Sequence, residues 1–286
     1  MKAVENFAKP LVSVIIPCYN SGATLLRAVD SVFQQTYSSV EVIVVNDGSS
    51  EIQTLEKLKD LDSAGVKVIQ HDINKGLPCA RNSGFTASSG EYVLFLDADD
   101  WFSETMVEEM IASTPISVET FFIFTDIFFE GERNGPSKRI YKPFSQLVVN
   151  RFPYALMIKK SSISWSPLYD EKLTHGLEDW GLNLNFLELG FTPIRVNRPL
   201  LHYHVSSQGM FAQNTQTKYF SIWKEIRESR YHLYSSQNIK RLIKAELSDS
   251  NFNTILLPLL LFFVSKLPIT TFLNKLFNVF NRLRWH

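Results

Sequence analysis

Apolar and polar positions alternate with two different periods along the N-terminal third of the chain. Four short runs are almost entirely apolar and rich in β-branched residues, which is typical of strands buried on both faces of a parallel sheet. Between these runs, apolar residues recur at helical spacing, as Leu25, Ala28 and Val32 do. The predicted strands are 11–19, 41–50, 66–71 and 92–99, and the predicted helices are 22–35, 51–62 and 77–88. This alternation predicts an α/β fold with a parallel sheet covered by helices.

The pattern loosens after residue 110. Gly190 is expected just beyond the end of a helix, where glycine readily adopts a left-handed conformation. Ser49 or Ser50 is predicted to cap the helix that begins near Glu51. We expect strands at 120–130 and 154–163, an extended segment at 193–205, an exposed loop at 131–138, and helices at 177–190 and through 214–247. The second half of the chain is therefore organised differently from the first.

Composition and charge exclude some classes of protein. The 286 residues suffice for one large domain or two small ones, and the 22 phenylalanines favour a packed core over disorder. Lys and Arg together number 29, as do Asp and Glu, so the formal net charge is zero. A neutral chain offers no general field for nucleic acid, and no nucleic-acid partner is expected.

Cysteine usage and the N-terminus bear on the compartment. Cys18 and Cys79 form no CxxC pair, so no zinc site is predicted, and two free thiols fit a reducing environment. The opening segment MKAVENFAKPLVSV contains no long apolar stretch of the kind found in a secretory signal. We therefore expect a cytoplasmic protein.

Polar residues follow each of the four predicted strands. Pro17, Tyr19 and Asn20 close the first strand, Asp47 lies in the turn residues that end the second run, and His71 is the last residue of the third. A group of aspartates follows the fourth. Because the carboxyl ends of parallel strands meet at one edge of an open α/β sheet, where ligands bind, these residues together form a candidate ligand site.

Three aspartates occupy four positions in FLDADDWF (95–102). Neighbouring carboxylates repel each other, so stability alone does not explain the cluster. Asp97 and Asp99 form an Asp-x-Asp pair that can share one hard cation, and Mg²⁺ or Mn²⁺ prefers oxygen ligands, including substrate phosphates. Asp100 is expected to cap or brace the turn. The sequence therefore predicts a site for a divalent cation, Mn²⁺ or Mg²⁺.

Five segments in order carry a family resemblance: VSVIIPCYN, VIVVNDGSS, GLPCARNSGF, GEYVLFLDADD and HGLEDW. Over about residues 9–205 the chain resembles the family 2 glycosyltransferases, which have the GT-A fold. The resemblance implies a mostly parallel central sheet flanked by helices, with a Rossmann-like nucleotide-binding half, an acceptor half and a helical C-terminal extension. The expected divisions are 1–110 for the nucleotide-sugar half, 111–210 for the acceptor half and 211–286 for the extension.

The resemblance also implies roles for residues near the donor. Tyr19 matches the position that lies against the nucleotide base, with core packing as the alternative. Asp47 matches the residue that accepts a hydrogen bond from the base, and it could instead cap the helix after residue 50. Arg81 is expected beside base or phosphate oxygens, or paired with an aspartate. The implied donor-binding residues are Pro17, Tyr19, Asp47, Arg81, Asn82 and Asp97, and the implied metal ligands are Asp99, Asp97 and His204.

On the acceptor side, the segment EDW matches the acid pair of the family. Asp179 is the expected general base, which takes the proton of the acceptor hydroxyl, and Glu178 is expected to orient it. The alternative is a helix N-terminus that favours acids through its dipole. Trp180 is expected to stack on a sugar or to anchor the helix in the core.

One segment departs from the family pattern. Members often carry an arginine and a histidine after the last core strand, but here LHYHVSSQGM places His204 at the arginine-like position and Ser206 at the histidine-like one. His202 or His204 could replace the missing contact with metal or pyrophosphate, and a histidine with no such role is the alternative.

The C-terminal segment 255–286 has no acid and carries four basic residues. Its run of apolar residues at 255–264 is shorter than the roughly 20 residues needed to span a bilayer. Residues 268–286 have the pattern of a basic amphipathic helix, which fits attachment to the inner face of the cell membrane. A helix packed on the protein or on a second subunit is the alternative.

These observations together predict an inverting, metal-dependent glycosyltransferase. It would move a sugar from a nucleotide-diphosphate sugar, preferably a UDP-sugar, to a hydroxyl of a glycan or lipid-linked acceptor in surface polysaccharide synthesis. A nucleotidyltransferase would need a phosphate loop rich in glycine and lysine after the first strand, and a dinucleotide-dependent oxidoreductase would need GxGxxG there. Neither motif is present. A non-catalytic sugar-nucleotide-binding partner with the same fold is the remaining alternative.

Overall fold

A computed structural model describes residues 9–150, 152–174, 176–207 and 216–248, together with Pro258 and Phe262. The chain divides into two compact units. The first unit comprises Met1–Lys138, Pro153–Leu168 and Thr192–His204, and the second comprises Arg139–Phe152, Tyr169–Phe191 and Val205–His286. The functional division into 1–110, 111–210 and 211–286 stays a prediction.

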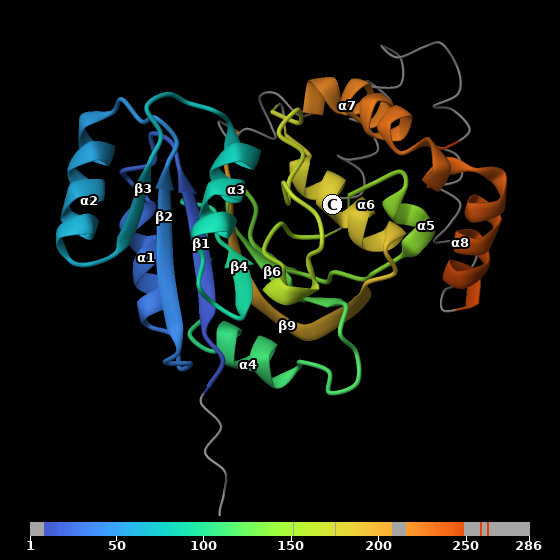
Figure 1. Ribbon diagram of the computed structural model, residues 1–286, viewed down its shortest axis with the longest axis horizontal. Coiled ribbons are helices and arrows are strands. Elements are labelled where there is room, and N and C mark those ends of the chain that lie inside the picture. Colours follow the sequence, from blue (N-terminus) through green and yellow to red (C-terminus); the bar gives the residue numbers. More distant parts are fainter. Residues whose placement is uncertain are drawn as a thin grey trace, which may run out of the picture. The chain divides into compact units, whose positions relative to one another are not determined.

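The first unit contains the predicted parallel sheet. Its strands lie in the order β3-β2-β1-β4, and all three pairings are parallel (Figure 1). The strands are β1 (Val12–Cys18), β2 (Val40–Asn46), β3 (Lys67–Gln70) and β4 (Tyr92–Phe95), and the helices between them are α1 (Leu25–Phe33), α2 (Ile52–Ser63) and α3 (Leu77–Ala87). Right-handed crossovers place α1 and α2 on one face and α3 on the other, because the chain reverses direction across the sheet after β3. The α/β fold predicted from the sequence is confirmed.

The core of this unit explains the apolar runs. Every residue of β1 is buried, and Ile15, Val44 and Phe95 are 0% exposed. Helices α1 and α3 both contact β1 and β2. Strands enclosed in this way have little contact with water on either face, so their side chains are mostly apolar.

Antiparallel pairings extend the sheet beyond β4. Strand β8 pairs with β4 and with β6, and β5 pairs with β9. The added strands are β5 (Trp101–Phe102), β6 (Phe121–Gly131), β7 (Gly135–Ser137), β8 (Met157–Lys159) and β9 (Thr192–Val205), with the helix α4 (Met106–Ala112) and the 3₁₀ turn η1 (Lys160–Ser162). The exposed loop predicted at 131–138 is in part a strand, because Gly135–Ser137 form β7, which pairs with β6.

The second unit is helical in its described part. Its elements are α5 (Pro143–Gln146), α6 (Glu178–Glu188), α7 (Gln216–Ser229), the 3₁₀ turn η3 (Tyr231–Tyr234) and α8 (Ser236–Ser248). Trp180 and Trp223 are buried in its core. Gly190 follows α6 with a φ of 71°, as predicted. The helix predicted at 214–247 is confirmed in α7 and α8 but is interrupted between them, where buried Leu233 lies in η3 and Ser235 accepts the Asn238 N–H.

The predicted amphipathic tail, 255–286, lies outside the described residues apart from Pro258 and Phe262. Phe262 is 5% exposed and packs edge-on against Phe144 in the second unit. In the part of the chain that the structure describes, no helix has the length and apolar character needed to cross a membrane. Attachment of the tail to a membrane stays a prediction.

Candidate active site

The ends of β1 and β2 lie at the same level of the sheet. Cys18 pairs with Asn46 in the parallel ladder, and the Asp47 N–H donates to the Cys18 carbonyl at 2.8 Å. Tyr19 follows directly and is 49% exposed, which rules out the alternative that it packs in the core. Pro17 is buried within β1, where it pairs with Val45 of β2, so it supports the end of the strand. The exposed ring of Tyr19 is available to a ligand above this edge.

Asn20 joins the turns that follow β1 and β2. Its side-chain oxygen accepts the N–H groups of Ser50 and Glu51 at 2.9 and 3.0 Å, and its own N–H donates to the Ser49 hydroxyl. The start of α2 is therefore held by a residue from another strand end. The prediction that Ser49 or Ser50 caps this helix was wrong, because Glu51 occupies the cap position and the helix has no side-chain cap bond of its own.

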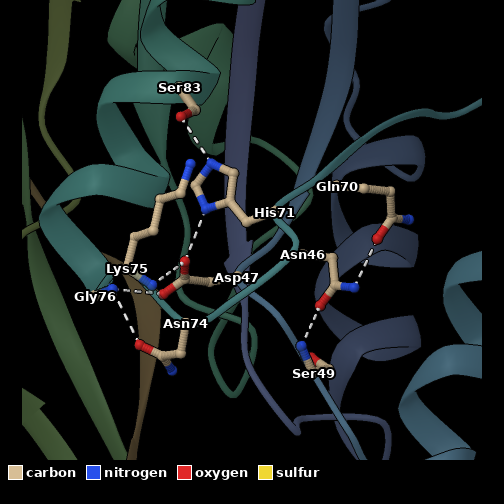
Figure 2. A network of polar contacts seen from close by, with 9 residues as sticks. All are labelled: Asn46, Asp47, Ser49, Gln70, His71, Asn74, Lys75, Gly76 and Ser83. Atoms are coloured by element: carbon tan, nitrogen blue, oxygen red, sulfur yellow. Dashed lines mark hydrogen bonds and ion pairs between the residues drawn. The ribbon is translucent and has the colours of Figure 1, made fainter.

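Asp47 is 3% exposed and sits at the centre of a hydrogen-bond network (Figure 2). Its carboxylate accepts the Lys75 N–H at 2.9 Å and the Gly76 N–H at 2.8 Å, and it contacts His71 Nδ1 at 2.8 Å. Gly76 is the N-cap residue of α3. The alternative that Asp47 caps the helix after residue 50 was therefore wrong, because this carboxylate secures the start of α3 instead.

Arg81 projects from α3 toward the end of β4. Its guanidinium donates to the Asp97 carboxylate at 2.6 Å and lies over the Tyr154 ring, 5.2 Å from the centroid. Arg81 is 1% exposed and its neighbour Asn82 is 8% exposed. The arginine therefore braces Asp97, which was one of the two roles considered for it.

Asp99 is the exposed member of the aspartate group that follows β4. Partial removal of the carboxyl group from water, together with the charge of Asp97, raises its pKa to about 6, although His204 and Arg27 partly offset this. Arg27 also donates to the Asp99 carbonyl at 2.8 Å and lies 3.7 Å from the centroid of the Trp101 ring. The site thus concentrates negative charge that an incoming cation would neutralise.

Asp100 is a structural residue of the same turn. It is 1% exposed, accepts the Tyr154 hydroxyl at 2.6 Å, and accepts the His204 N–H at 2.7 Å. Burial and the charges of Asp99 and Asp97 raise its pKa well above the ordinary value. The Tyr154 oxygen in turn accepts the Asp97 N–H at 3.0 Å. The aspartate turn is therefore fixed to β9 and to the segment before β8, as expected for a bracing residue.

Replacing Tyr154 by Phe is expected to lower the free energy of unfolding by about 1–3 kcal/mol, because the buried Asp100 carboxyl loses its hydroxyl partner. Urea denaturation followed by tryptophan fluorescence measures the change. The exposed Tyr231→Phe variant is the matched control and should unfold with wild-type stability. Equal stability of the Tyr154→Phe variant and the wild type would show that this hydrogen bond does not brace the turn.

The residues present fit a cation that is shared with a diphosphate. Among the described residues, no group of three His, Cys, Asp or Glu side chains converges on an ion-sized site. Asp99 offers an exposed carboxylate, and one oxygen of Asp97 is engaged by Arg81. Mg²⁺ and Mn²⁺ commonly take only one or two carboxylates and fill their remaining positions with phosphate oxygens and water.

The two histidines of β9 differ in their surroundings. His202 contacts Glu130 at 2.8 Å and Ser103 at 3.0 Å, and its ring stacks on Trp101 at 5.1 Å. These contacts hold His202 as a packing residue of the sheet. His204 is half-buried, and its charge lowers the pKa of Asp99. Of the two, His204 is the better candidate to contact the metal or pyrophosphate.

The predicted acceptor-side acids lie in the first turn of α6 in the second unit. Asp179 is half-buried and accepts the Asn150 side-chain amide at 2.7 Å and the Trp180 N–H at 2.8 Å. Glu178 is 5% exposed. Trp180 is fully buried and donates to the Gln146 carbonyl at 2.6 Å, so it anchors α6 and does not stack on a sugar. Asn150 fixes the Asp179 carboxylate in one orientation.

Sequence reasoning missed several residues that shape the site. Tyr154 and Asn150 lie in segments whose patterns indicate only a strand and a loop. Arg27 lies on the polar side of a predicted helix, where a solvated charge is the common outcome. No periodicity identifies such partners, because their contacts join positions from 29 to 72 residues apart.

The comparisons with known proteins agree with this architecture. The family model described as glycosyl transferase family 2 matches residues 13–156. The glycosyltransferase GlyA of Streptococcus pneumoniae is 29% identical over 214 residues, which cover 68% of this chain and 30% of GlyA. EpsJ of Bacillus subtilis, an uncharacterized glycosyltransferase, is 41% identical over 105 residues, 35% of this chain and 29% of EpsJ. The chain spans less than a third of the length of either relative.

Solved structures share the fold. TarS of S. aureus, residues 1–349 in complex with UDP-GlcNAc, superposes with a TM-score of 0.64 at 18% identity, covering 86% of this chain and 75% of TarS 1–349. The mannosyltransferase PcManGT of Pyrobaculum calidifontis, in complex with GDP-Man and Mn²⁺, superposes with a TM-score of 0.57 at 14% identity. The match covers 94% of this chain and 85% of PcManGT. The fold is thus that of GT-A glycosyltransferases. The chain belongs to glycosyl transferase family 2, as its sequence resemblance predicted.

Proposed function

We propose that the protein is an inverting, metal-dependent glycosyltransferase that uses a nucleotide-diphosphate sugar, with a UDP-sugar as the preferred donor. One observation carries the proposal. Tyr19, Asp47 and the aspartates 97 and 99 follow β1, β2 and β4, which meet where the chain direction across the sheet reverses. Ligands of open α/β sheets bind at this position. The UDP-GlcNAc complex of TarS supports the choice of nucleotide.

Each residue of the proposed site has a chemical task. Tyr19 lies against the base, Asp47 accepts an N–H from it, and Asp99 and Asp97 hold the cation, with His204 as a further contact. The cation would neutralise the charge of the departing diphosphate. Asp179 takes the proton of the acceptor hydroxyl as that oxygen bonds to the anomeric carbon and the bond to the diphosphate breaks. Asn150 keeps Asp179 oriented for this transfer.

The acceptor belongs to the same proposal. We infer a hydroxyl of a glycan or of a lipid-linked saccharide, by analogy with the family. The basic, acid-free segment 255–286 supports a location at the inner membrane surface, where a lipid-linked acceptor would be presented.

A thermal-shift panel of UDP, GDP, dTDP, CDP and ADP, with and without Mn²⁺, tests the proposal. A ligand that binds the native state alone raises its stability by about 2.7 kcal/mol at a concentration of 100 Kd. We expect a rise in Tm that requires both a nucleotide and the metal. If a well-folded sample shows no rise with any nucleotide, the proposal is overturned.

A further inference from the structure

The Asp47 carboxylate is already close to saturated before any ligand binds (Figure 2). A carboxylate offers about four acceptor positions, two on each oxygen. Oδ1 receives the Lys75 N–H and the His71 ring, and Oδ2 receives the Gly76 N–H. Among the described residues, these contacts leave one acceptor position, on Oδ2. Asp47 can therefore accept one further N–H, and not two side by side.

The hydrogen-bond partners of His71 fix its tautomer. An ionised carboxylate only accepts, so His71 Nδ1 carries the proton and donates it to Asp47 at 2.8 Å. In the neutral ring, Nε2 is then an acceptor, and the Ser83 hydroxyl donates to it at 2.9 Å. His71 is 9% exposed, and both of its ring nitrogens are hydrogen-bonded. His71 therefore takes one of the two acceptor positions of Asp47 Oδ1.

The loop before α3 packs closely against the turn that carries Asp47. Gly48 has a φ of 70°, and a Cβ placed on it would lie 2.4 Å from the Asn74 N atom. The turn after β2 and the loop that supplies Lys75 and Gly76 are therefore in direct backbone contact. His71 at the end of β3 and the Lys75 and Gly76 N–H groups of this loop hold the Asp47 carboxylate in one orientation.

Nucleobases differ in how many N–H groups they present to such a carboxylate. Uracil and thymine present a single N–H between two carbonyls. Guanine presents two adjacent donors, a ring N–H and an amino group, which are best matched by both oxygens of a free carboxylate. Cytosine also presents an amino donor, but the ring nitrogen beside it accepts, so the lone pair of that nitrogen would face the carboxylate. A carboxylate with one open position matches uracil or thymine, and leaves one guanine donor unpaired.

We propose that His71 is a specificity-determining positioning residue. By occupying Oδ1 of Asp47, it makes the base site a single-acceptor site that takes uridine or thymidine diphosphates and rejects guanosine diphosphate. This inference rests on the proposed function, since it concerns the same donor site. It adds the class of nucleobase that the site selects, and it adds His71 as a residue that acts through Asp47.

Titration calorimetry with UDP, dTDP, CDP and GDP in the presence of Mn²⁺ tests the inference on the full chain. We expect UDP and dTDP to bind at least about tenfold more tightly than GDP and CDP, the effect of one unpaired polar group. His71→Leu opens Oδ1 and should reduce the difference between UDP and GDP to within about threefold. In His71→Asn, the amide nitrogen stands where Nδ1 stood, so this variant should keep the selectivity.

Gln70→Leu is the matched control. It removes another side-chain hydrogen bond between β2 and β3, which the Asn46 amide donates to the Gln70 side-chain oxygen at 2.6 Å, without touching Asp47. Its ratio of UDP to GDP affinity should equal that of the wild type, and an equal loss in Gln70→Leu and His71→Leu would overturn the role of His71. GDP binding as tightly as UDP to the wild type would overturn the inference and the preference for UDP, while leaving the proposed metal-dependent use of a nucleotide-diphosphate sugar intact. Binding of no nucleotide would overturn both.

Discussion

Replacing Asp179 by Asn is expected to slow glycosyl transfer by about 10²–10⁴-fold, the usual contribution of a general base. The amide oxygen can still accept one of the two hydrogen bonds that the carboxylate accepts, and buried Trp180 still anchors α6, so the first turn should remain in place. The affinity for UDP should not change, because the base acts on the acceptor hydroxyl. Release of UDP from a UDP-sugar in the presence of acceptor measures transfer, and calorimetry measures UDP binding.

Two further variants separate catalysis from structure. Glu188→Gln removes an exposed acid from the other end of α6 and should transfer sugar at the wild-type rate. Asn150→Ala removes the amide that orients Asp179, and it should lower kcat by about tenfold with little change in KM. If Asp179→Asn weakened UDP binding as much as transfer, the residue would belong to the donor site and the assignment of the base would be wrong.

Replacing Asp99 by Ala is expected to abolish the metal-dependent part of nucleotide binding. In the wild type, Mn²⁺ together with UDP should raise Tm, whereas in the variant UDP should give the same small rise with and without Mn²⁺. The reason is that Asp99 is the exposed carboxylate of the turn, while Asp97 is paired with Arg81 and Asp100 is buried. Asp60→Ala, which removes an exposed acid from α2, is the control and should respond as the wild type does.

The pKa of Asp99 gives a second test of the same assignment. This carboxyl has a pKa of about 6 without metal, so protons compete with the cation as the pH falls through that value. Between pH 6 and 5, the affinity for Mn²⁺ should fall by up to about tenfold, and between pH 7 and 8 it should hardly change. A nucleotide sugar is the appropriate ligand, because its diphosphate diester does not titrate in this range. A pH-independent affinity would remove Asp99 from the proposed metal ligands.

The parts of the fold that could be predicted are those that depend on local pattern. Strands β1 and β4 are buried at every position and are almost entirely apolar, so both runs are visible in the sequence. The predictions that were wrong concern contacts between different segments of the chain. Asn20 takes over the helix cap expected of Ser49 or Ser50, and β7 turns back onto β6. The cap by Asn20 has no local signature, because Asn20 and Ser50 lie 30 residues apart.

The candidate site, too, could be predicted in part from the sequence and in part could not. By itself, the sequence determined that polar residues of the right chemistry, Tyr19, Asp47 and the aspartates after β4, stand where parallel strands end, because strand ends share one edge of the sheet. Only the tertiary structure decided what each of them does there: Arg81 pairs with Asp97, and His71 occupies one oxygen of Asp47. These partners lie 16 and 24 residues apart in the chain. A buried charge takes whichever partner the packing of strands and helices brings within hydrogen-bond distance, and that packing is a property of the whole unit.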